Sequence, residues 1–322
     1  MTDGSAGAPP LVVVAGATAT GKTELAIRLA EAFIATGRPA AVISADSRQV
    51  FRGLDIGTAK ASPADRARVA HHGLDLVDPD QSFSVADFTT HARDALAGID
   101  RMGGVAILAG GTGLYLRAVA RGLDTDALPS DPRLRARLEA ELIDDGLGPL
   151  VSRLQGIAPL ASVGVDLRNP RRVVRALEIA ELAGDLRRPA ALGYPGPTTW
   201  IGLTIEPAAH THRIARRAQA QFDAGLIDEA RTLRERFAPT LPAFSAIGYR
   251  EAWAVLDGEL TRPAAIELDA RRNVGFAKRQ RTWFRSEPGI SWLPVDDGLP
   301  ITPAFELAQR AVEEASPIRP RP

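Results

Sequence analysis

The chain of 322 residues contains no cysteine, and this absence excludes disulfide bonds, thiolate nucleophiles and zinc sites built on thiolates. Its formal net charge at pH 7 is zero, so the composition predicts no overall electrostatic attraction to nucleic acid or to a membrane. Long apolar runs are missing as well, because the run at 11–15 is too short for a signal peptide or a membrane span. These absences predict a cytoplasmic protein without membrane association.

The residues that are present predict a globular α/β fold. With 45% hydrophobic and 24% charged residues, the chain has enough apolar material to bury a core. Short apolar runs alternate with segments of helical periodicity, and this alternation predicts a parallel sheet wound with helices. The expected strands are residues 11–15, 41–45, 74–77, 105–109, 200–205 and 290–293.

The alternation is interrupted by a stretch rich in arginine, leucine and alanine. Asp131 followed by Pro132 is a typical helix start, and only helix-like segments follow until about residue 192. We therefore expect a helical insertion domain within an α/β core that carries a helical C-terminal part. The expected parts are a disordered N-terminus at 1–10, the core at 11–128 and 193–314, the insertion at 129–192 and a disordered tail at 315–322.

A glycine-rich loop follows the first expected strand and precedes a helix. It matches the pattern G-x-x-x-x-G-K-[ST] with Gly16, Ala17, Thr18, Ala19, Thr20, Gly21, Lys22 and Thr23. The glycines permit backbone angles that side chains block, so successive N–H groups can point at anionic oxygens. Because Lys22 adds a full charge and Thr23 a hydroxyl that can bind Mg²⁺, the loop is predicted to bind a diphosphate or triphosphate.

Loops of this kind most often bind ATP or GTP, but a feature of the nucleotide hydrolases is missing. Such hydrolases place an acidic residue after a neighbouring strand to hold Mg²⁺, whereas the strand at 105–109 is followed by Gly110, Gly111 and Thr112. The candidate acid is Asp46, which follows the second strand. At the carboxyl edge of a parallel sheet it faces the same crevice as the loop, which suits a base that deprotonates a second substrate.

Several further motifs occur together in the order found in one enzyme family. They are DSRQVFRGLDIGTAK at 46–60, FSVADF at 83–88, GGTGLY at 110–115, RALE at 175–178, AIGYRE at 246–251, AKRQ at 277–280 and TWF at 282–284. In these motifs and in the glycine-rich loop, the chain resembles the tRNA dimethylallyltransferases over about residues 12–292.

This resemblance implies transfer of a dimethylallyl group from dimethylallyl diphosphate to N6 of adenosine 37, beside the anticodon of tRNAs that read codons beginning with U. It implies that Lys22, Thr23 and Mg²⁺ hold the diphosphate, and that Asp46 accepts a proton from the adenine amine. Thr112 is then expected to line the channel between the two substrates. Arg213 and Arg217, which are four residues apart and share a helix face, are expected near the diphosphate. The resemblance also implies a monomer.

Three groups of residues are expected to contact tRNA. Ser47 and Gln49 lie beside Asp46, where they can read polar edges of the bases. The stretch 271–285 is basic, contains no acidic residue and includes aromatic side chains, as single-stranded RNA binding requires. The remaining predicted RNA-binding residues are Arg168, Arg171, Arg172 and Arg175 of the insertion, and Lys278, Arg279 and Gln280. Trp283 and Phe284 are expected in the core instead.

The chain departs from the family pattern at three places. Phe51 replaces a tyrosine, Asn273-Val274 replaces Thr-Arg, and Asn169-Pro170 replaces Asn-Asp. The diphosphate motifs are intact, so the departures concern expected RNA contacts. None of the five histidines has the spacing of a metal ligand set, so surface or capping roles are expected for them.

Other functions remain open on the sequence. An isopentenyltransferase for free adenine nucleotides shares the loop and the base, but it has less use for a helical insertion and a basic stretch. A kinase for a small molecule is disfavoured because no acid follows Ala109. A non-catalytic RNA-binding protein has no need of intact Lys22, Thr23 and Asp46.

Overall fold

The computed structural model describes residues 8–125, 128–184 and 190–314. The disorder expected at 1–10 and 315–322 therefore lies outside the described residues, except at 8–10. There the prediction is wrong, because the Pro9 carbonyl accepts a hydrogen bond from the Tyr194 hydroxyl at 2.8 Å and the chain leads directly into the first strand. The chain divides into two compact units, Met1–Arg121 with Gly193–Pro322 and, by itself, Gly122–Leu192.

The first unit is built on one sheet of six parallel strands, as the sequence predicts. The strands are β1 (Leu11–Gly16), β2 (Ala40–Ser44), β3 (Ala70–His72), β4 (Val105–Gly110), β5 (Thr198–Thr204) and β6 (Ile290–Pro294). Their order across the sheet is β3-β2-β4-β1-β5-β6, so β1 is central, between β4 and β5. The carboxyl ends of β1, β2 and β4 consequently lie side by side at one edge.

The prediction of a third strand at 74–77 is wrong, since β3 is formed by Ala70–His72. After β3 the backbone turns at Gly73, whose φ is +80° and where a side chain would meet the Ser44 carbonyl oxygen at 2.5 Å. Asp75 has a φ of +56°, which no strand residue adopts. Val77 forms only an isolated parallel bridge with Phe51.

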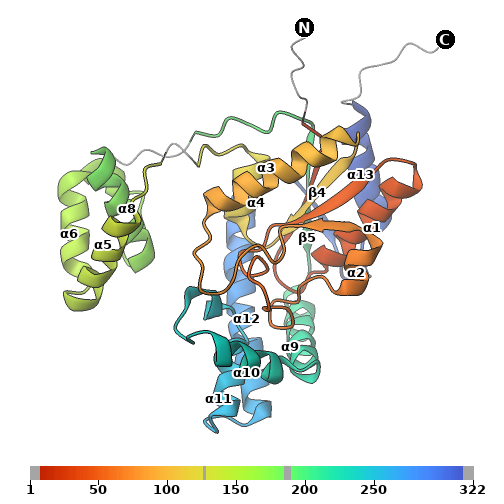
Figure 1. The fold of residues 1–322 in the computed structure, drawn as a ribbon. Helices are drawn as coiled ribbons and strands as arrows, with labels where there is room; N and C mark the ends of the chain where they lie inside the picture. Colours follow the sequence, from red (N-terminus) through yellow and green to blue (C-terminus); the bar gives the residue numbers. More distant parts are fainter. Residues whose placement is uncertain (1–7, 126–127, 185–189, 315–322) are drawn as a thin grey trace. The chain divides into compact units, whose positions relative to one another are not determined.

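Helices cover both faces of the sheet (Figure 1). On one face α1 (Lys22–Ala35) and α13 (Ile301–Glu314) pack against alternate strand residues such as Val12, Val14 and Ile107. On the other face the intervening residues, such as Val13, Ile43 and Leu108, pack against α3 (Val85–Arg101), α4 (Gly113–Ala120) and part of α12 (Arg262–Arg285). The period of two along each strand therefore fills two separate cores.

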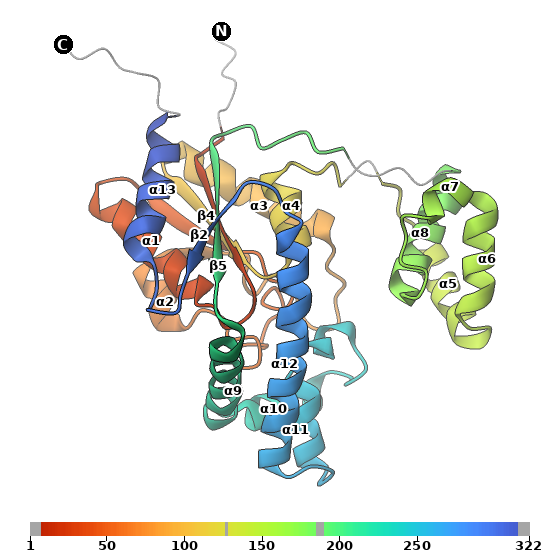
Figure 2. The same cartoon turned by 180° about the vertical axis from the view of Figure 1, so that it is seen from behind.

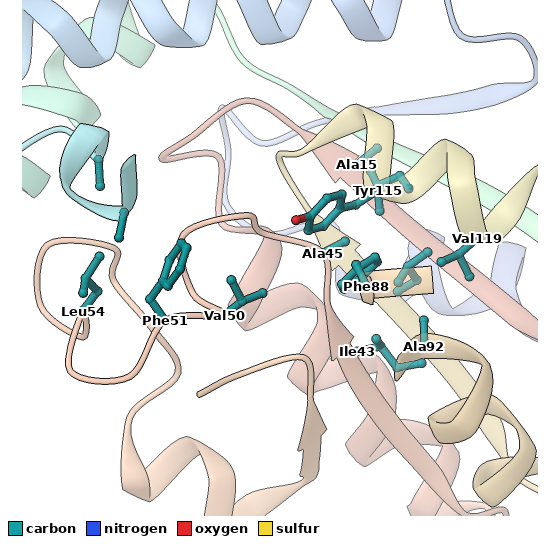
Figure 3. Packing of buried hydrophobic residues seen from close by; sticks show 14 of the residues in the cluster. Ala15, Ile43, Ala45, Val50, Phe51, Leu54, Phe88, Ala92, Tyr115 and Val119 are labelled. Atoms are coloured by element: carbon teal, nitrogen blue, oxygen red, sulfur yellow. The ribbon is translucent and has the colours of Figure 1, made fainter. Parts of the chain in front are cut away.

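The second of these cores extends beyond the sheet. The rings of Phe88 and Tyr115 stack with centroids 4.2 Å apart, beside Ala45 at the end of β2. Val50, Phe51 and Leu54, from the loop after β2, continue the same apolar cluster (Figure 3). The loop is thus anchored by buried side chains, which is unusual for a connecting segment.

A helical layer follows β5 in the sequence. It consists of α9 (Pro207–Asp223), α10 (Leu226–Arg236), the 3₁₀ turn η1 (Pro242–Ser245) and α11 (Tyr249–Leu256). The long α12 runs from this layer, beside α9, to the sheet (Figure 2). A short helix, α2 (Pro63–Arg68), precedes β3 and has a capping box made by Ser62 and Asp65.

The second unit, Gly122–Leu192, is helical. It contains α5 (Pro132–Asp144), α6 (Leu147–Ile157), the single turn α7 (Pro159–Ser162) and α8 (Pro170–Ala183), and helix α5 starts where Asp131 and Pro132 predict. Leucines such as Leu138, Leu154 and Leu177 form its own core. The expected insertion began at 129, whereas the compact unit begins at Gly122.

Candidate active site

The loop at 16–23 connects β1 to α1 at the carboxyl edge of the sheet. Gly21 is left-handed with a φ of +93°, a conformation that favours glycine, and a side chain there would also displace the end of the Leu299 side chain, 2.6 Å away. Ala19 also has a positive φ, +60°, which a residue with a side chain rarely adopts. Inside the loop, the Thr20 hydroxyl and the Lys22 ammonium both donate to the Ala17 carbonyl oxygen, at 2.9 and 2.6 Å.

Three charged groups surround this loop. Burial and, to a smaller extent, the positive charge of Arg217 lower the pKa of Lys22 to about 8, against the negative charge of Asp46. Burial likewise lowers the pKa of Arg217, against the attraction of Asp46. Two partly desolvated cations therefore share one carboxylate, and an added anion would relieve the repulsion between the cations.

Asp46 and Thr112 lie at the ends of neighbouring strands, as predicted. The Thr112 hydroxyl oxygen accepts a hydrogen bond from the Ser47 N–H at 3.0 Å, and the Asp46 Oδ1 accepts one from the Arg48 N–H at 2.8 Å. The close approach depends on Gly110, where a side chain would meet the Ala45 carbonyl oxygen at 2.0 Å. A hydrolase-type aspartate at position 110 is therefore sterically impossible in this sheet.

The loop at 46–60 is held by a buried cation. The Lys60 ammonium, whose side chain is 1% exposed, donates to Asp55 and Asp75 at 2.6 Å each and to the Phe51 carbonyl oxygen at 2.8 Å. A buried ammonium with two carboxylates and a carbonyl has all its protons satisfied. The lysine that ends the 46–60 motif is thus explained as a structural residue.

The same loop is also fixed to α10 and α11. Backbone N–H groups of Asp55, Ile56 and Gly57 donate to the Glu229 carboxylate at 3.2, 2.7 and 3.1 Å. The hydroxyl of the buried Tyr249 donates to the same carboxylate at 2.7 Å. Because Asp46 begins this loop, these contacts restrict the positions that the Asp46 backbone can take.

Gln49, predicted to read the bases, is placed in the loop interior. It is 9% exposed, its oxygen accepts from the Ser44 hydroxyl at 2.7 Å, and its amide nitrogen donates to the carbonyl oxygens of Thr58 and Ala59. Its amide atoms are therefore used within the protein. Ser47 remains half-buried beside Asp46.

Gln280, predicted to bind tRNA, is also buried, at 6% exposure. Its oxygen accepts from the Thr18 N–H at 2.8 Å and its nitrogen donates to the Gly111 carbonyl oxygen at 2.9 Å. A side chain at Gly111 would meet this amide at 2.3 Å, so the glycine makes room for it. Gln280 thus bridges the 16–23 loop and the turn that contains Thr112.

His210 is a residue whose role the sequence did not indicate. A surface or capping role was expected, but the ring is 1% exposed and its Nε2 lies 2.8 Å from the Thr18 carbonyl oxygen. The expectation is wrong because the contact joins residues 192 positions apart. Because β5 pairs with β1, helix α9, which follows β5, begins next to the 16–23 loop. This pairing brings His210 to Thr18.

Arg213 and Arg217 share a face of α9, as predicted, but their contacts differ. Arg217 donates to the Thr18 hydroxyl at 2.7 Å, while Arg213 donates to the Val295 carbonyl oxygen at 2.6 Å. Arg217 therefore lies directly at the loop. Arg213 is half-buried and is held by the segment after β6.

A cavity of about 240 Å³ opens beside the 16–23 loop. Its wall is formed mainly by apolar groups and includes backbone of the loop. The lining residues are Gly16, Ala17, Thr20, Leu203, Thr204, Ile205, His210, Arg281, Phe284, Arg285 and Trp292. Phe284 is a core residue, as predicted, whereas Trp283 is half-buried under the Arg117 guanidinium, 4.3 Å from its ring centroid.

The site offers one hydroxyl group that suits the expected Mg²⁺. Thr23 is exposed at the first turn of α1, next to Lys22, so its hydroxyl can be one ligand. In the parts of the chain that the structure describes, no three His, Asp or Glu side chains gather into a metal cage. One hydroxyl fits an ion held mainly by substrate phosphate oxygens and water, which is how Mg²⁺ is commonly bound.

Comparison with known proteins decides the family. The model of the IPP transferase family matches residues 49–287. A tRNA dimethylallyltransferase of Roseiflexus sp. (strain RS-1) is 41% identical over 305 residues, covering 94% of this chain and 96% of that protein. The chain belongs to the tRNA dimethylallyltransferase family. A second relative of the same name, from Kineococcus radiotolerans, is 40% identical and also covers 94% of this chain and 96% of its own length.

Solved structures of the family agree with the fold. The tRNA isopentenylpyrophosphate transferase of Bacillus halodurans matches with a TM-score of 0.69 and 37% identity, covering 95% of this chain and 98% of that one. A eukaryotic dimethylallyltransferase acting on tRNA matches with a TM-score of 0.77. The match covers 97% of this chain and 82% of that one, and at 22% identity it supports the fold alone.

Of the remaining residues predicted to contact tRNA in this dimethylallyltransferase family member, some are exposed and one is used within the protein. Lys278 and Arg279 are exposed on α12, and Arg279 lies over the Phe276 ring. In the second unit Arg168, Arg171 and Arg172 are exposed, but Arg175 donates to the buried Glu178 at 2.8 Å and to the Pro129 carbonyl oxygen at 2.9 Å. Arg175 thus holds its own unit together.

Among the described residues, no helix is long and apolar enough to cross a membrane.

Proposed function

We propose that this family member transfers the dimethylallyl group of dimethylallyl diphosphate to N6 of adenosine 37, beside the anticodon of tRNAs that read codons beginning with U. The observation that carries the proposal is the placement of Asp46 and Thr112 next to the 16–23 loop, at the carboxyl ends of β1, β2 and β4. One edge of the sheet then offers an anion site and a carboxylate within a single crevice.

The reaction that fits these groups breaks one bond and forms one. The C1–O bond of the donor breaks and its electron pair leaves with diphosphate, while the N6 lone pair of adenosine forms the new bond to C1. Negative charge grows on the leaving group, so contacts from Lys22, Arg217 and the loop N–H groups strengthen in the transition state. Thr23 and the diphosphate oxygens would hold Mg²⁺, which stabilises the same charge.

Asp46 is the proposed base, which takes the proton released from N6. Its Oδ1 accepts a hydrogen bond from the Arg48 N–H, which orients the carboxylate. An aryl amine is a weak nucleophile, so orientation of the amine counts as much as basicity. Thr112, bonded to the Ser47 N–H, is proposed to line the passage between the two substrates.

The acceptor is proposed to be tRNA because the chain carries basic surface that a small acceptor does not need. Lys278 and Arg279 on α12, and Arg168, Arg171 and Arg172 in the second unit, are exposed. Phosphate contacts from such residues would supply salt-dependent affinity. The target base has to leave its stack to reach Asp46, as other modified bases do.

We propose that the protein acts as a monomer in the cytoplasm.

The test is incubation of the purified chain with Mg²⁺, dimethylallyl diphosphate and unmodified tRNA whose anticodon ends in A, followed by nucleoside mass analysis. We expect a gain of one dimethylallyl unit on a single adenosine next to the anticodon. The matched control is the same tRNA with that adenosine replaced by guanosine, which should remain unchanged. A gain on free AMP but not on tRNA would replace this proposal by the nucleotide enzyme, and ATP turnover without either gain would indicate a kinase.

A further inference from the structure

Thr18, at the middle of the 16–23 loop, is held at each of its three polar groups. Its N–H donates to Gln280 Oε1 at 2.8 Å, its carbonyl oxygen lies 2.8 Å from His210 Nε2, and its hydroxyl oxygen accepts from Arg217 at 2.7 Å. These side chains come from α9 and α12, and Thr18 itself is 8% exposed. We call Gln280, His210 and Arg217 the Thr18 clamp.

The hydrogen-bond network fixes the proton on the histidine ring. An Arg281 guanidinium N–H lies 2.9 Å from His210 Nδ1, and since a guanidinium only donates, Nδ1 is the acceptor. The ring proton therefore sits on Nε2 and is donated to the Thr18 carbonyl oxygen. Burial is the main reason that the pKa of His210 is lowered, and the charge of Arg281 adds to it. A neutral ring of this tautomer satisfies both contacts.

The loop needs such support because of its backbone. Ala19, directly after Thr18, has a φ of +60°, a left-handed conformation that a residue with a side chain keeps only where its surroundings enforce it. The Thr18 N–H donates to Gln280, so this donor is used within the protein and is not free for an anion. The clamp therefore decides which of the loop's N–H groups are turned toward an anion.

We propose that Gln280 and His210 are positioning residues for the donor diphosphate, acting through Thr18 rather than by touching the substrate. The inference rests on the proposed function and adds a role to two residues that lie outside the G-x-x-x-x-G-K-T pattern. Gln280 extends the same control to the turn with Thr112 through its bond to the Gly111 carbonyl oxygen. Loss of the clamp should therefore weaken diphosphate binding selectively.

Two substitutions at His210 form a matched pair. In His210→Gln the amide nitrogen reaches the position of Nε2 and keeps the donor to Thr18, whereas in His210→Asn the shorter side chain places its polar group near Nδ1 and loses that donor. Gln280→Met keeps the shape of the side chain and loses both of its hydrogen bonds. The control is Gln309→Met on α13, whose amide contacts only Glu313 among the partners that the structure gives it.

The measurements are the calorimetric Kd for pyrophosphate with Mg²⁺, the KM for dimethylallyl diphosphate and the Kd for tRNA. His210→Asn and Gln280→Met should each raise the pyrophosphate Kd and the donor KM roughly tenfold, the worth of one good hydrogen bond. In His210→Asn the kcat at saturating donor and the tRNA Kd should change less than about threefold. His210→Gln should recover most of the affinity that His210→Asn loses, and Gln309→Met should match the unsubstituted protein.

Equal pyrophosphate affinity in all variants would overturn the proposal, and so would equal defects in His210→Asn and His210→Gln. Should Gln280→Met fail to fold, the comparison of His210→Asn with His210→Gln decides the proposal by itself. Tight pyrophosphate binding that depends on the clamp, without any transfer to tRNA, would reject the proposed function and leave the clamp standing.

Discussion

The Thr112 hydroxyl oxygen accepts a hydrogen bond from the Ser47 N–H at 3.0 Å and thereby joins the ends of β4 and β2. Ser47 directly follows Asp46, so this contact sets how far the proposed base lies from the turn at 110–112. The hydroxyl groups of the same two residues, Thr112 and Ser47, form a second contact, with their oxygens 3.4 Å apart. The pair is thus a structural link inside the crevice as well as part of its polar lining.

Thr112→Ala should lower the single-turnover rate roughly tenfold, because the Ser47 N–H loses its acceptor and the Asp46 segment gains freedom. Thr112→Ser retains the acceptor and should recover most of the rate. The measurement is rapid-quench transfer of labelled dimethylallyl with enzyme in excess over tRNA. If Thr112→Ser is as slow as Thr112→Ala, the methyl group rather than the hydrogen bond matters.

Asp46→Asn should lower turnover by roughly two to four orders of magnitude, the usual contribution of a general base. The asparagine side-chain oxygen still accepts from the Arg48 N–H, so the substitution removes basicity and charge while preserving the local geometry. The tRNA Kd, measured by filter binding, should change little. Normal turnover in Asp46→Asn would show that the base assignment is wrong.

Replacing Lys278 and Arg279 together by glutamine should weaken tRNA binding and flatten its salt dependence. Both side chains are exposed on α12, and each phosphate contact contributes roughly 0.7 to the slope of log K against log salt for single strands. The slope should therefore fall by about 1.4. The control is Arg310→Gln, an exposed arginine on α13, which packs on the opposite face of the sheet. An unchanged slope would contradict the assigned RNA surface.

Much of the fold could be predicted because its signals are local. β1 and β4 are continuous apolar runs, and so is β2 up to Ser44; such short runs are typical of strands buried on both faces, and the structure buries nearly all of these residues. The failure at 74–77 has a physical cause as well. Its apolar residues resemble a strand, but Gly73 and Asp75 turn the chain there and the Lys60 ammonium draws Asp75 inward.

The contacts of the site were harder to predict, because they join distant parts of the chain. His210 and Gln280 meet Thr18 across separations of 192 and 262 residues, and no spacing in the sequence expresses such a contact. Gln49 and Gln280 belong to recognised motifs, yet a motif does not say which way a side chain points. Their amides turn inward because each faces backbone groups that need partners.

Donor binding should weaken above pH 8, since burial lowers the pKa of Lys22 to about 8. Below that pH the ammonium is charged and attracts the diphosphate; above it the group becomes neutral, and kcat/KM for the donor should fall by up to tenfold per pH unit. Bound diphosphate raises the pKa again, so kcat should fall only at higher pH. Lys22→Arg stays charged throughout and should show no decline. A decline of the same size in Lys22→Arg would assign it to another group.

The stability of the protein against pH should carry the signature of Asp269. This carboxyl group on α12 is 1% exposed and accepts a hydrogen bond from the Asn273 amide at 2.8 Å. Burial and the charge of Glu251 raise its pKa to about 6, against the Asn273 bond and the charges of Arg217 and Arg272. Since the unfolded value is 3.8, the folded protein binds the extra proton between pH 3.8 and about 6.

The extra proton on Asp269 stabilises the folded protein at low pH. The free energy of unfolding therefore falls as pH rises through that window, and this contribution is absent at neutral pH. Asp269→Asn cannot titrate, so relative to the unsubstituted protein it should gain roughly 2 to 3 kcal/mol between pH 4 and pH 7. Urea unfolding at pH 4.5, 5.5 and 7.0 measures the difference, with the exposed Asp297→Asn as control. A stability difference that does not change with pH would mean that Asp269 is ionised throughout, held so by Arg217 and Arg272.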